Sequence, residues 1–127
     1  MFDVLVIEDS LTDRMILKMY LEKAGLKVKA LSNAESALEL MKSSQPLVII
    51  TDIILPDMSG FQLCRKLKKN SQLVLNISVI ICSSKNTKVD KFWAEMSGAD
   101  AYFTKPYALE QIVKKVGQLI GLSPQSR

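Results

Sequence analysis

The sequence predicts a single α/β domain in which a five-stranded parallel sheet carries helices on both faces. Five short strand-like segments alternate with five helical patterns, and such alternation is typical of parallel sheets with right-handed crossovers. Most of these segments are apolar throughout rather than at every second residue, as in strands buried on both faces. The chain has 127 residues, 48% of them apolar, which suffices for one hydrophobic core.

The first four elements follow from local patterns. Asp3–Ile7 is a buried strand, and the helix Ser10–Ala24 opens with a capping pattern and stops at Gly25. Lys27–Leu31 alternates charged and apolar residues, which indicates a more exposed strand. The helix Ser32–Lys42 starts at a polar segment and ends before a Gln-Pro pair, because the residue before proline disfavours helix.

The remaining elements repeat this alternation. Leu47–Thr51 and Ser78–Cys82 are apolar, β-branched segments expected to be buried strands, with the helix Gly60–Lys69 between them. The helix Thr87–Ser97 is closed by a glycine. The chain then supplies two last elements, a short strand at Ala101–Thr104 and a helix at Leu109–Ile120.

Composition excludes several classes of protein. The longest apolar runs are too short to span a membrane, and the amino terminus lacks the basic region of a secretion signal. Histidine is absent, and Cys64 and Cys82 lack metal-ligand spacing, so disulfide scaffolds and zinc fingers are poor fits. The net charge is +4, but basic residues are scattered, even around Arg65–Lys69, so we expect no direct nucleic-acid binding. A cytoplasmic protein without membrane insertion is expected.

Charged and hydroxyl side chains stand where the predicted strands end. Glu8 and Asp9 follow the first strand, Asp52 the third, Ser83 the fourth and Lys105 the fifth. The carboxyl ends of parallel strands form the ligand-binding edge of such sheets, so these residues should converge there. Three clustered acids repel unless a cation neutralises them, and an oxygen-only ligand set favours Mg²⁺.

These residue types point to phosphoryl chemistry. A carboxylate beside Mg²⁺ can attack a phosphoryl group and become an aspartyl phosphate. Asp52 is the best candidate for the nucleophile, because it is the single acid at the end of a central strand. The loop that follows it offers backbone groups around its carboxylate. Lys105 would neutralise phosphoryl oxygens and Ser83 would donate a hydrogen bond to them.

These motifs resemble the receiver domain of two-component response regulators, of the single-domain chemotaxis type with the flavodoxin-like (βα)5 fold. The resemblance runs from about Asp3 to Ile120. A narrower likeness, to PilH- and PilG-type regulators of pilus motility and phototaxis, lies in residues 84–102. The matching site residues are Glu8-Asp9, Asp52 in Thr-Asp-Ile-Ile-Leu-Pro-Asp-Met-Ser-Gly, Ser83 and Lys105-Pro106.

The resemblance implies a role for each of these residues. Asp52 would be the phosphoacceptor, and Mg²⁺ would bind Asp9, Asp52 and the backbone carbonyl of Ile54, with Glu8 acting largely through water. Lys105 would contact the phosphoryl group and precede a cis proline bond. The switch pair would be Ser83 and Tyr102, with the hydroxyl moving to the phosphate and the ring turning inward.

The family also implies partners. The phosphodonor would be a histidine kinase, and the effector would bind the face formed by the fourth helix, last strand and fifth helix. In the fourth helix, Val89, Phe92 or Trp93, and Met96 have the spacing of a core stripe, with one aromatic left at its rim. We expect a monomer or weak dimer.

The receiver would span residues 1–122, with a short tail at 123–127 and no output domain.

Three alternatives share features with this interpretation. A phosphatase of the haloacid dehalogenase type needs an Asp-x-Asp pair, which Asp52-Ile-Ile lacks. A flavodoxin-like cofactor binder should carry a Ser-, Thr- and Gly-rich phosphate loop after the first strand, and absence of flavin colour would dismiss it. A receiver-like scaffold that acts without phosphorylation is the remaining alternative.

Two positions bear on the lifetime of the phosphorylated form. In this family the residues two beyond the phosphoacceptor and two beyond Ser83 help to place the hydrolytic water, and here they are Ile54 and Lys85. Because an apolar Ile54 cannot orient water, we hypothesise slow self-dephosphorylation. A phosphoryl half-life of only seconds would contradict it.

Overall fold

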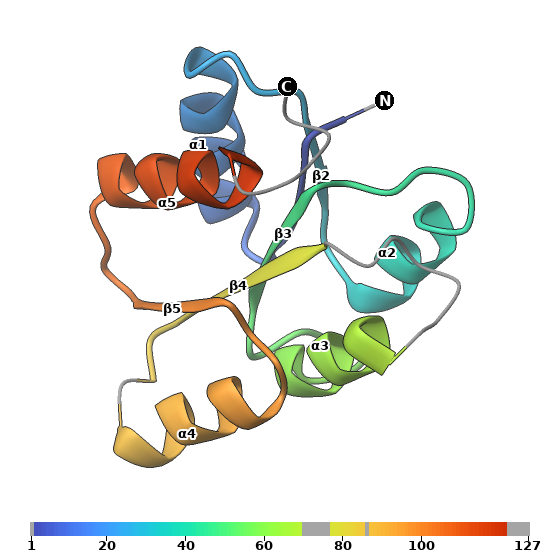
Figure 1. Ribbon diagram of the computed structural model, residues 1–127, viewed down its shortest axis with the longest axis vertical. Coiled ribbons are helices and arrows are strands. Elements are labelled where there is room, and N and C mark those ends of the chain that lie inside the picture. The colour runs from blue at the N-terminus through green and yellow to red at the C-terminus, as the bar shows by residue number, and fades with distance from the viewer. Residues whose placement is uncertain (1, 70–76, 86, 122–127) are drawn as a thin grey trace.

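Five strands and five helices alternate along the chain (Figure 1). The computed structural model describes residues 2–69, 77–85 and 87–121, so the expected tail at 123–127 lies outside the described residues. The strands are β1 (Val4–Ile7), β2 (Val28–Leu31), β3 (Val48–Asp52), β4 (Ser78–Ser83) and β5 (Ala101–Thr104). The helices are α1 (Leu11–Lys23), α2 (Ala34–Leu40), α3 (Gly60–Lys69), α4 (Lys88–Met96) and α5 (Leu109–Gly121).

The strands form one parallel sheet in the order β2-β1-β3-β4-β5, which confirms the predicted fold class. In the register, Ile7 of β1 lies beside Thr51 of β3, and Ser83 of β4 lies beside Thr104 of β5. The order reverses between β1 and β3, and ligands of open α/β sheets bind at such a point, beyond the carboxyl ends of the strands.

Continuous apolar strands are explained by two cores, one on each face of the sheet. Side chains of successive strand residues point to opposite faces. Leu5 and Ile7 pack in the core beneath α2, α3 and α4, whereas Val4 and Val6 pack in the core beneath α1 and α5. Figure 1 shows the same division, with α1 and α5 on one side of the sheet and the other helices opposite.

Helix boundaries agree with the predicted signals. Ser10 caps α1 by accepting a hydrogen bond from the Asp13 amide, and Thr87 and Asp90 form a reciprocal capping box on α4. Gly25 and Gly98 follow α1 and α4 with φ of 92° and 95°, a conformation that glycine adopts without steric cost. Ser10 and Thr87 therefore fix where the loops that follow β1 and β4 end and the next helices start.

The predicted core stripe of α4 is wrong. Val89, Phe92, Trp93 and Met96 are 49–64% exposed, and Ala94 is the buried residue of the helix. Helical spacing identified a face of the helix, but that face points to solvent. The two aromatic rings instead pack against each other in a T-shaped arrangement, with centroids 5.9 Å apart.

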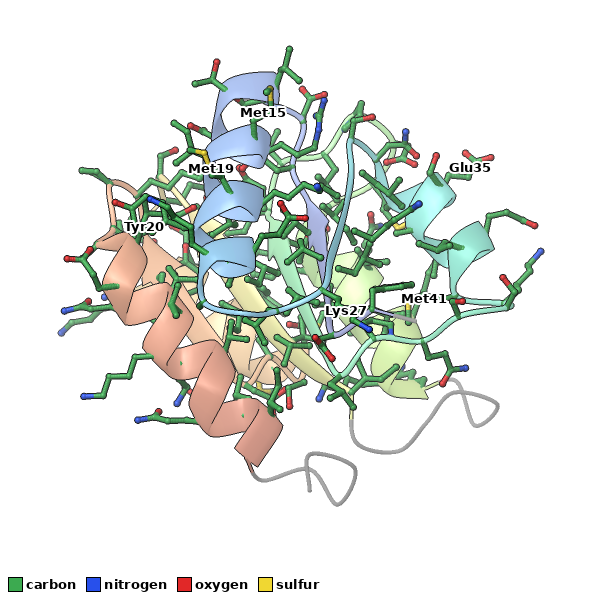
Figure 2. The ribbon with its side chains drawn as sticks, turned by 90° about the horizontal axis from the view of Figure 1, so that it is seen from above. Met15, Met19, Tyr20, Lys27, Glu35 and Met41 are labelled. Carbon is green, nitrogen blue, oxygen red and sulfur yellow. The ribbon has the colours of Figure 1, made fainter. Side chains whose placement is uncertain are left out.

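Helix α1 also carries an exposed apolar stripe. Methionine commonly fills protein cores, yet Met15 and Met19 are 60% and 55% exposed along α1 (Figure 2), in line with exposed Leu11. Met41, in contrast, is buried. Within the described helices, none has the length and apolar character required to cross a membrane.

Both cysteines are free and buried, as expected for small apolar residues. Cys64 lies in the core beneath α2 to α4, and Cys82 lies in the core beneath α1 and α5. Burial raises the pKa of both thiols above their ordinary value, which keeps them protonated and unreactive at neutral pH.

Candidate functional site

Glu8 is a buried carboxylate at the end of β1. Its side chain accepts a hydrogen bond from the Ser10 amide at 3.0 Å and another from the Lys105 ammonium at 2.7 Å. The residue is 7% exposed. A buried carboxylate requires such partners, so the site includes a carboxylate that is already neutralised by a lysine.

Asp52 ends the neighbouring strand β3 and shares the same lysine. One carboxylate oxygen accepts from Lys105 Nζ at 2.8 Å, and the other accepts from the Ile54 amide at 3.3 Å. Its side chain is 14% exposed. The structure therefore brings the predicted nucleophile, one predicted acid and the predicted lysine into direct contact.

Lys105 reaches this position from the end of β5. Its amide donates to the Ser83 carbonyl at 2.7 Å, and the bond to Pro106 is cis, as the resemblance implied. Burial alone would lower the pKa of the ammonium, but its hydrogen bonds to Asp52 and Glu8 outweigh this and raise the pKa above its ordinary value. The lysine is therefore a fixed positive charge.

Asp9 is exposed beside this cluster, and Arg14 fixes the backbone that carries it. Arg14 Nη1 donates to the carbonyl of Glu8 at 2.7 Å and to that of Asp9 at 3.3 Å. Among the described residues, the Asp9 carboxylate makes no hydrogen bond to a protein group. It is therefore the acid of the site that is most available to a cation.

The residues present fit Mg²⁺ through the chemistry of their donor set. The carboxylates of Asp9 and Asp52 and the Ile54 carbonyl are all oxygen ligands, and Mg²⁺ binds few protein groups because it keeps several waters. Within residues 2–69, 77–85 and 87–121, no three acidic or cysteine side chains cluster closely enough to hold a metal by themselves. A backbone carbonyl and water would have to complete the coordination.

The two predicted switch residues meet at the loop after β4. Ser83 is 1% exposed, and its hydroxyl accepts from the Lys85 amide at 3.2 Å. The Tyr102 hydroxyl donates to the Lys85 carbonyl. Burial raises the pKa of Tyr102, the negative charge of Asp90 adds to this, and a hydrogen bond with Ser83 opposes it. Ser83 and Tyr102 therefore share Lys85 as a backbone partner.

The loop between β3 and α3 is fixed at its base. Ile54 and Ser59 form an isolated antiparallel bridge, and the Gly60 amide donates to the Ile53 carbonyl at 2.7 Å. A Cβ atom on Gly60 would lie 2.2 Å from the Asp52 carbonyl oxygen, so glycine is required there. The Ile54 side chain is 61% exposed beside the site.

Three charged residues contact the site or its loops without having been predicted to do so. Asp13 lies 3.5 Å from Lys105 Nζ, Arg14 binds the carbonyls after β1, and Asp57 binds the first turn of α2. The spacing of Asp13 and Arg14 after Glu8-Asp9 on a predicted helix was a usable signal. No local signal pointed to Asp57, whose partners lie more than twenty residues away.

The fold is a parallel α/β domain, and a cluster of acidic side chains and one lysine lies at the carboxyl edge of its sheet. The response regulator receiver domain model matches residues 4–117, and the chain belongs to that family. It is 33% identical to Protein PilH of Pseudomonas aeruginosa over 117 residues, which cover 92% of this chain and 96% of that protein.

Solved structures agree with this assignment. The receiver domain of a signal transduction histidine kinase from Syntrophus aciditrophicus superposes with a TM-score of 0.89 at 28% identity, covering 100% of this chain and 96% of that one. The chemotaxis response regulator CheY4 of Vibrio cholerae gives a TM-score of 0.84 at 24% identity, covering 94% and 98%, and shows the shared fold.

Proposed function

We propose that this chain is a response regulator switched by phosphorylation at Asp52, with a histidine kinase as phosphodonor and Mg²⁺ as cofactor. The observation that supports it most is the Asp52 carboxylate held 2.8 Å from the Lys105 ammonium at the carboxyl edge of the sheet. The protein acts as a phosphoacceptor that promotes its own phosphorylation, rather than as an enzyme that turns over a separate substrate.

The proposed step is a displacement at phosphorus. An Asp52 carboxylate oxygen forms the new P–O bond while the bond from phosphorus to the donor nitrogen of phosphohistidine breaks, and the imidazole leaves with a proton from solvent. Mg²⁺, held by Asp9, Asp52 and the Ile54 carbonyl with Glu8 acting through water, would neutralise charge on the phosphoryl oxygens. Lys105 supplies a second positive charge there.

Ser83 and Tyr102 would transmit the phosphorylation of Asp52 to the protein surface near α4. The phosphate adds a charge of about −1.5 to −2 at Asp52. Ser83 can give up the Lys85 amide and donate its hydroxyl to a phosphate oxygen, which frees Tyr102 to turn inward. Both contacts involve the loop that leads into α4, so the change reaches the neighbouring helix surface.

The effector would bind the face formed by α4, β5 and α5. Phe92 and Trp93 lie exposed on α4, and exposed aromatic side chains are frequent binding hot spots. We propose a cytoplasmic role in chemotaxis or pilus motility, supported by the similarity to PilH. The protein would act as a monomer or weak dimer.

The intact mass of the protein after incubation with acetyl phosphate tests this proposal. We expect one phosphoryl addition in the presence of Mg²⁺, none after chelation, and none in Asp52→Asn. Asp3→Asn is the matched control, because it makes the same chemical change at the opposite end of β1. Absence of the adduct in a folded protein that binds Mg²⁺ would contradict the proposal and favour a scaffold that acts without phosphorylation.

The phosphorylated form should be long-lived. Ile54 is exposed beside Asp52 and carries no polar group that could orient an attacking water. Ile54→Asn should shorten the half-life of the adduct by about tenfold, because general positioning effects of this kind are worth one or more orders of magnitude. Decay of the mass adduct after the donor is removed measures this half-life, and equal decay in both proteins would refute the assignment.

A further inference from the structure

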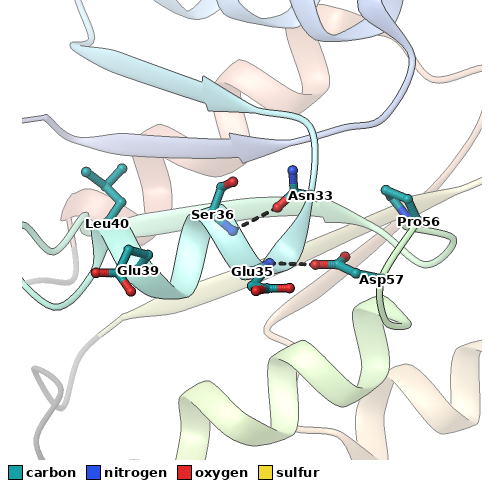
Figure 3. A pocket seen from close by; sticks show the side chains of 7 residues that line it. All are labelled: Asn33, Glu35, Ser36, Glu39, Leu40, Pro56 and Asp57. Atoms are coloured by element: carbon teal, nitrogen blue, oxygen red, sulfur yellow. Dashed lines mark hydrogen bonds between the residues drawn. The ribbon is translucent and has the colours of Figure 1, made fainter.

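Asp57 joins the loop after β3 to a helix much earlier in the chain. Its two carboxylate oxygens accept hydrogen bonds from the Ala34 amide at 3.1 Å and from the Glu35 amide at 2.7 Å. Figure 3 shows Asp57 reaching across a pocket to the first turn of α2. The hydrogen bonds from Glu35 and Ala34 lower the pKa of this carboxyl despite the opposing effect of desolvation, so it is ionised at neutral pH.

The partner of Asp57 is a well-fixed element. The first amides of a helix have no partner within the helix. Asn33 caps α2 by accepting from the Ser36 amide at 2.8 Å, and Asp57 binds two more of these amides. Ala34 and Ala37 are fully buried and seat the helix on the core. Asp57 therefore connects its loop to a rigid surface.

The same loop carries the Ile54 carbonyl, which the proposed function assigns to Mg²⁺. The base of the loop is fixed by the Ile54–Ser59 bridge and by the Gly60 amide. Asp57 lies in the turn enclosed by that bridge, where these contacts do not reach. Leu55 and Met58 of this turn pack in the core beneath α2, α3 and α4. The two hydrogen bonds of Asp57 are the polar side-chain contacts that the structure describes between this turn and α2.

We propose that Asp57 is a positioning residue for the magnesium site. By binding the first turn of α2 it fixes the loop that presents the Ile54 carbonyl beside Asp9 and Asp52. Without it the loop occupies the binding-competent geometry for a smaller fraction of the time, and the apparent affinity falls by that fraction. Loss of such outer contacts typically weakens metal binding by about 10-fold or more. The inference rests on the proposed function only for the ligand role of Ile54.

Calorimetric titration of the full chain with MgCl₂ tests this role. Asp57→Ala should weaken Mg²⁺ binding by about tenfold, and Asp57→Asn should fall between it and wild type because the amide retains one acceptor oxygen. Asn33→Ala is the matched control, since it removes a cap from the same helix without touching the loop. The inference is overturned if Asp57→Ala binds Mg²⁺ as wild type does, or if Asn33→Ala weakens binding equally.

A second readout needs neither metal nor phosphate. Amide hydrogen exchange at Ile54 and Met58 in the metal-free protein should be faster in Asp57→Ala and unchanged in Asn33→Ala. In acetyl phosphate reactions, Asp57→Ala should raise the Mg²⁺ concentration at which phosphorylation reaches half of its maximal rate. The phosphorylation rate at saturating Mg²⁺ should stay unchanged. If Mg²⁺ binding depends on Asp57 but no phosphoryl adduct forms, the proposed function fails and this inference stands. If wild type binds no Mg²⁺, the inference fails.

Discussion

Replacing Lys105 with methionine should destabilise the metal-free protein by about 3 kcal/mol. The ammonium lies 2.7 Å from Glu8 and 2.8 Å from Asp52, and the three side chains are 21%, 9% and 14% exposed. Breaking a buried ion pair costs about 3–5 kcal/mol, because a charge is left without its partner. We expect a value at the lower end of this range, because the Lys105 side chain is 21% exposed and water can reach the carboxylates that lose their partner.

The same substitution should strengthen Mg²⁺ binding. The lysine places a positive charge beside Asp52, the carboxylate that is proposed to bind the metal. Removing the repulsion between this charge and Mg²⁺ is worth about 1 kcal/mol in a solvent-accessible site, or roughly fivefold in affinity. Saturating Mg²⁺ should therefore reduce the difference in unfolding free energy between Lys105→Met and wild type. Phosphoryl uptake should nevertheless fall, because the charge that Lys105 places on the phosphoryl oxygens is lost.

Urea unfolding followed by far-ultraviolet circular dichroism, with and without Mg²⁺, measures both effects. Lys68→Met is the matched control, because Lys68 also binds a carboxylate, Asp100 at 2.9 Å, but in a more exposed pair at the amino-terminal end of β4, away from the site at the carboxyl ends of the strands. It should lose about 1 kcal/mol irrespective of metal. The reasoning is refuted if the unfolding free energy of metal-free Lys105→Met is within about 1 kcal/mol of the wild-type value. It is also refuted if Mg²⁺ reduces the differences from wild type equally for Lys105→Met and Lys68→Met.

Three further outcomes follow from the loops around the site. Gly60→Ala should cost about 2–3 kcal/mol in the same urea assay, because its Cβ would meet the Asp52 carbonyl oxygen at 2.2 Å. Arg14→Lys, which keeps the positive charge but loses the guanidinium contact with both carbonyls after β1, should weaken Mg²⁺ binding about tenfold in calorimetry, with stability nearly unchanged. The folded-state pKa of Asp57 is lowered, so its stabilisation is complete above the ordinary value of 3.8 and is lost as the pH falls through the folded value. The difference in unfolding free energy between wild type and Asp57→Asn should therefore be constant from about pH 7 to 5 and shrink below about pH 4, as acid-dependent urea unfolding would show.

The strands and the centre of the site were predictable because they depend on patterns that are local in the sequence. Each buried strand is a continuous apolar segment, and a parallel sheet necessarily aligns its strand ends. Placing Glu8, Asp52 and Lys105 together therefore required only the strand assignments. Their contacts at 2.7 and 2.8 Å are the direct consequence of that alignment.

The remaining features depend on which surfaces meet in three dimensions. Asp57 binds amides of α2, and a backbone partner leaves no signature in the identities of the residues that supply it. On α4, the spacing of Val89, Phe92 and Met96 was read correctly as one face, but spacing does not say whether a face is covered. The buried residues here are Ala94 in α4 and Ser97 directly after it. Their side chains are small, so the sequence did not indicate that this face of the helix is the covered one.

The exposed position of Trp93 has a practical consequence. It is the single tryptophan of the chain, lies 49% exposed on α4 and packs edge-on against Phe92 rather than in the core. Its indole emission should therefore change little when the protein unfolds, since the ring is already in contact with water. A partner that covers α4 would shift the emission to shorter wavelength, so the protein carries its own fluorescent reporter for docking at this face.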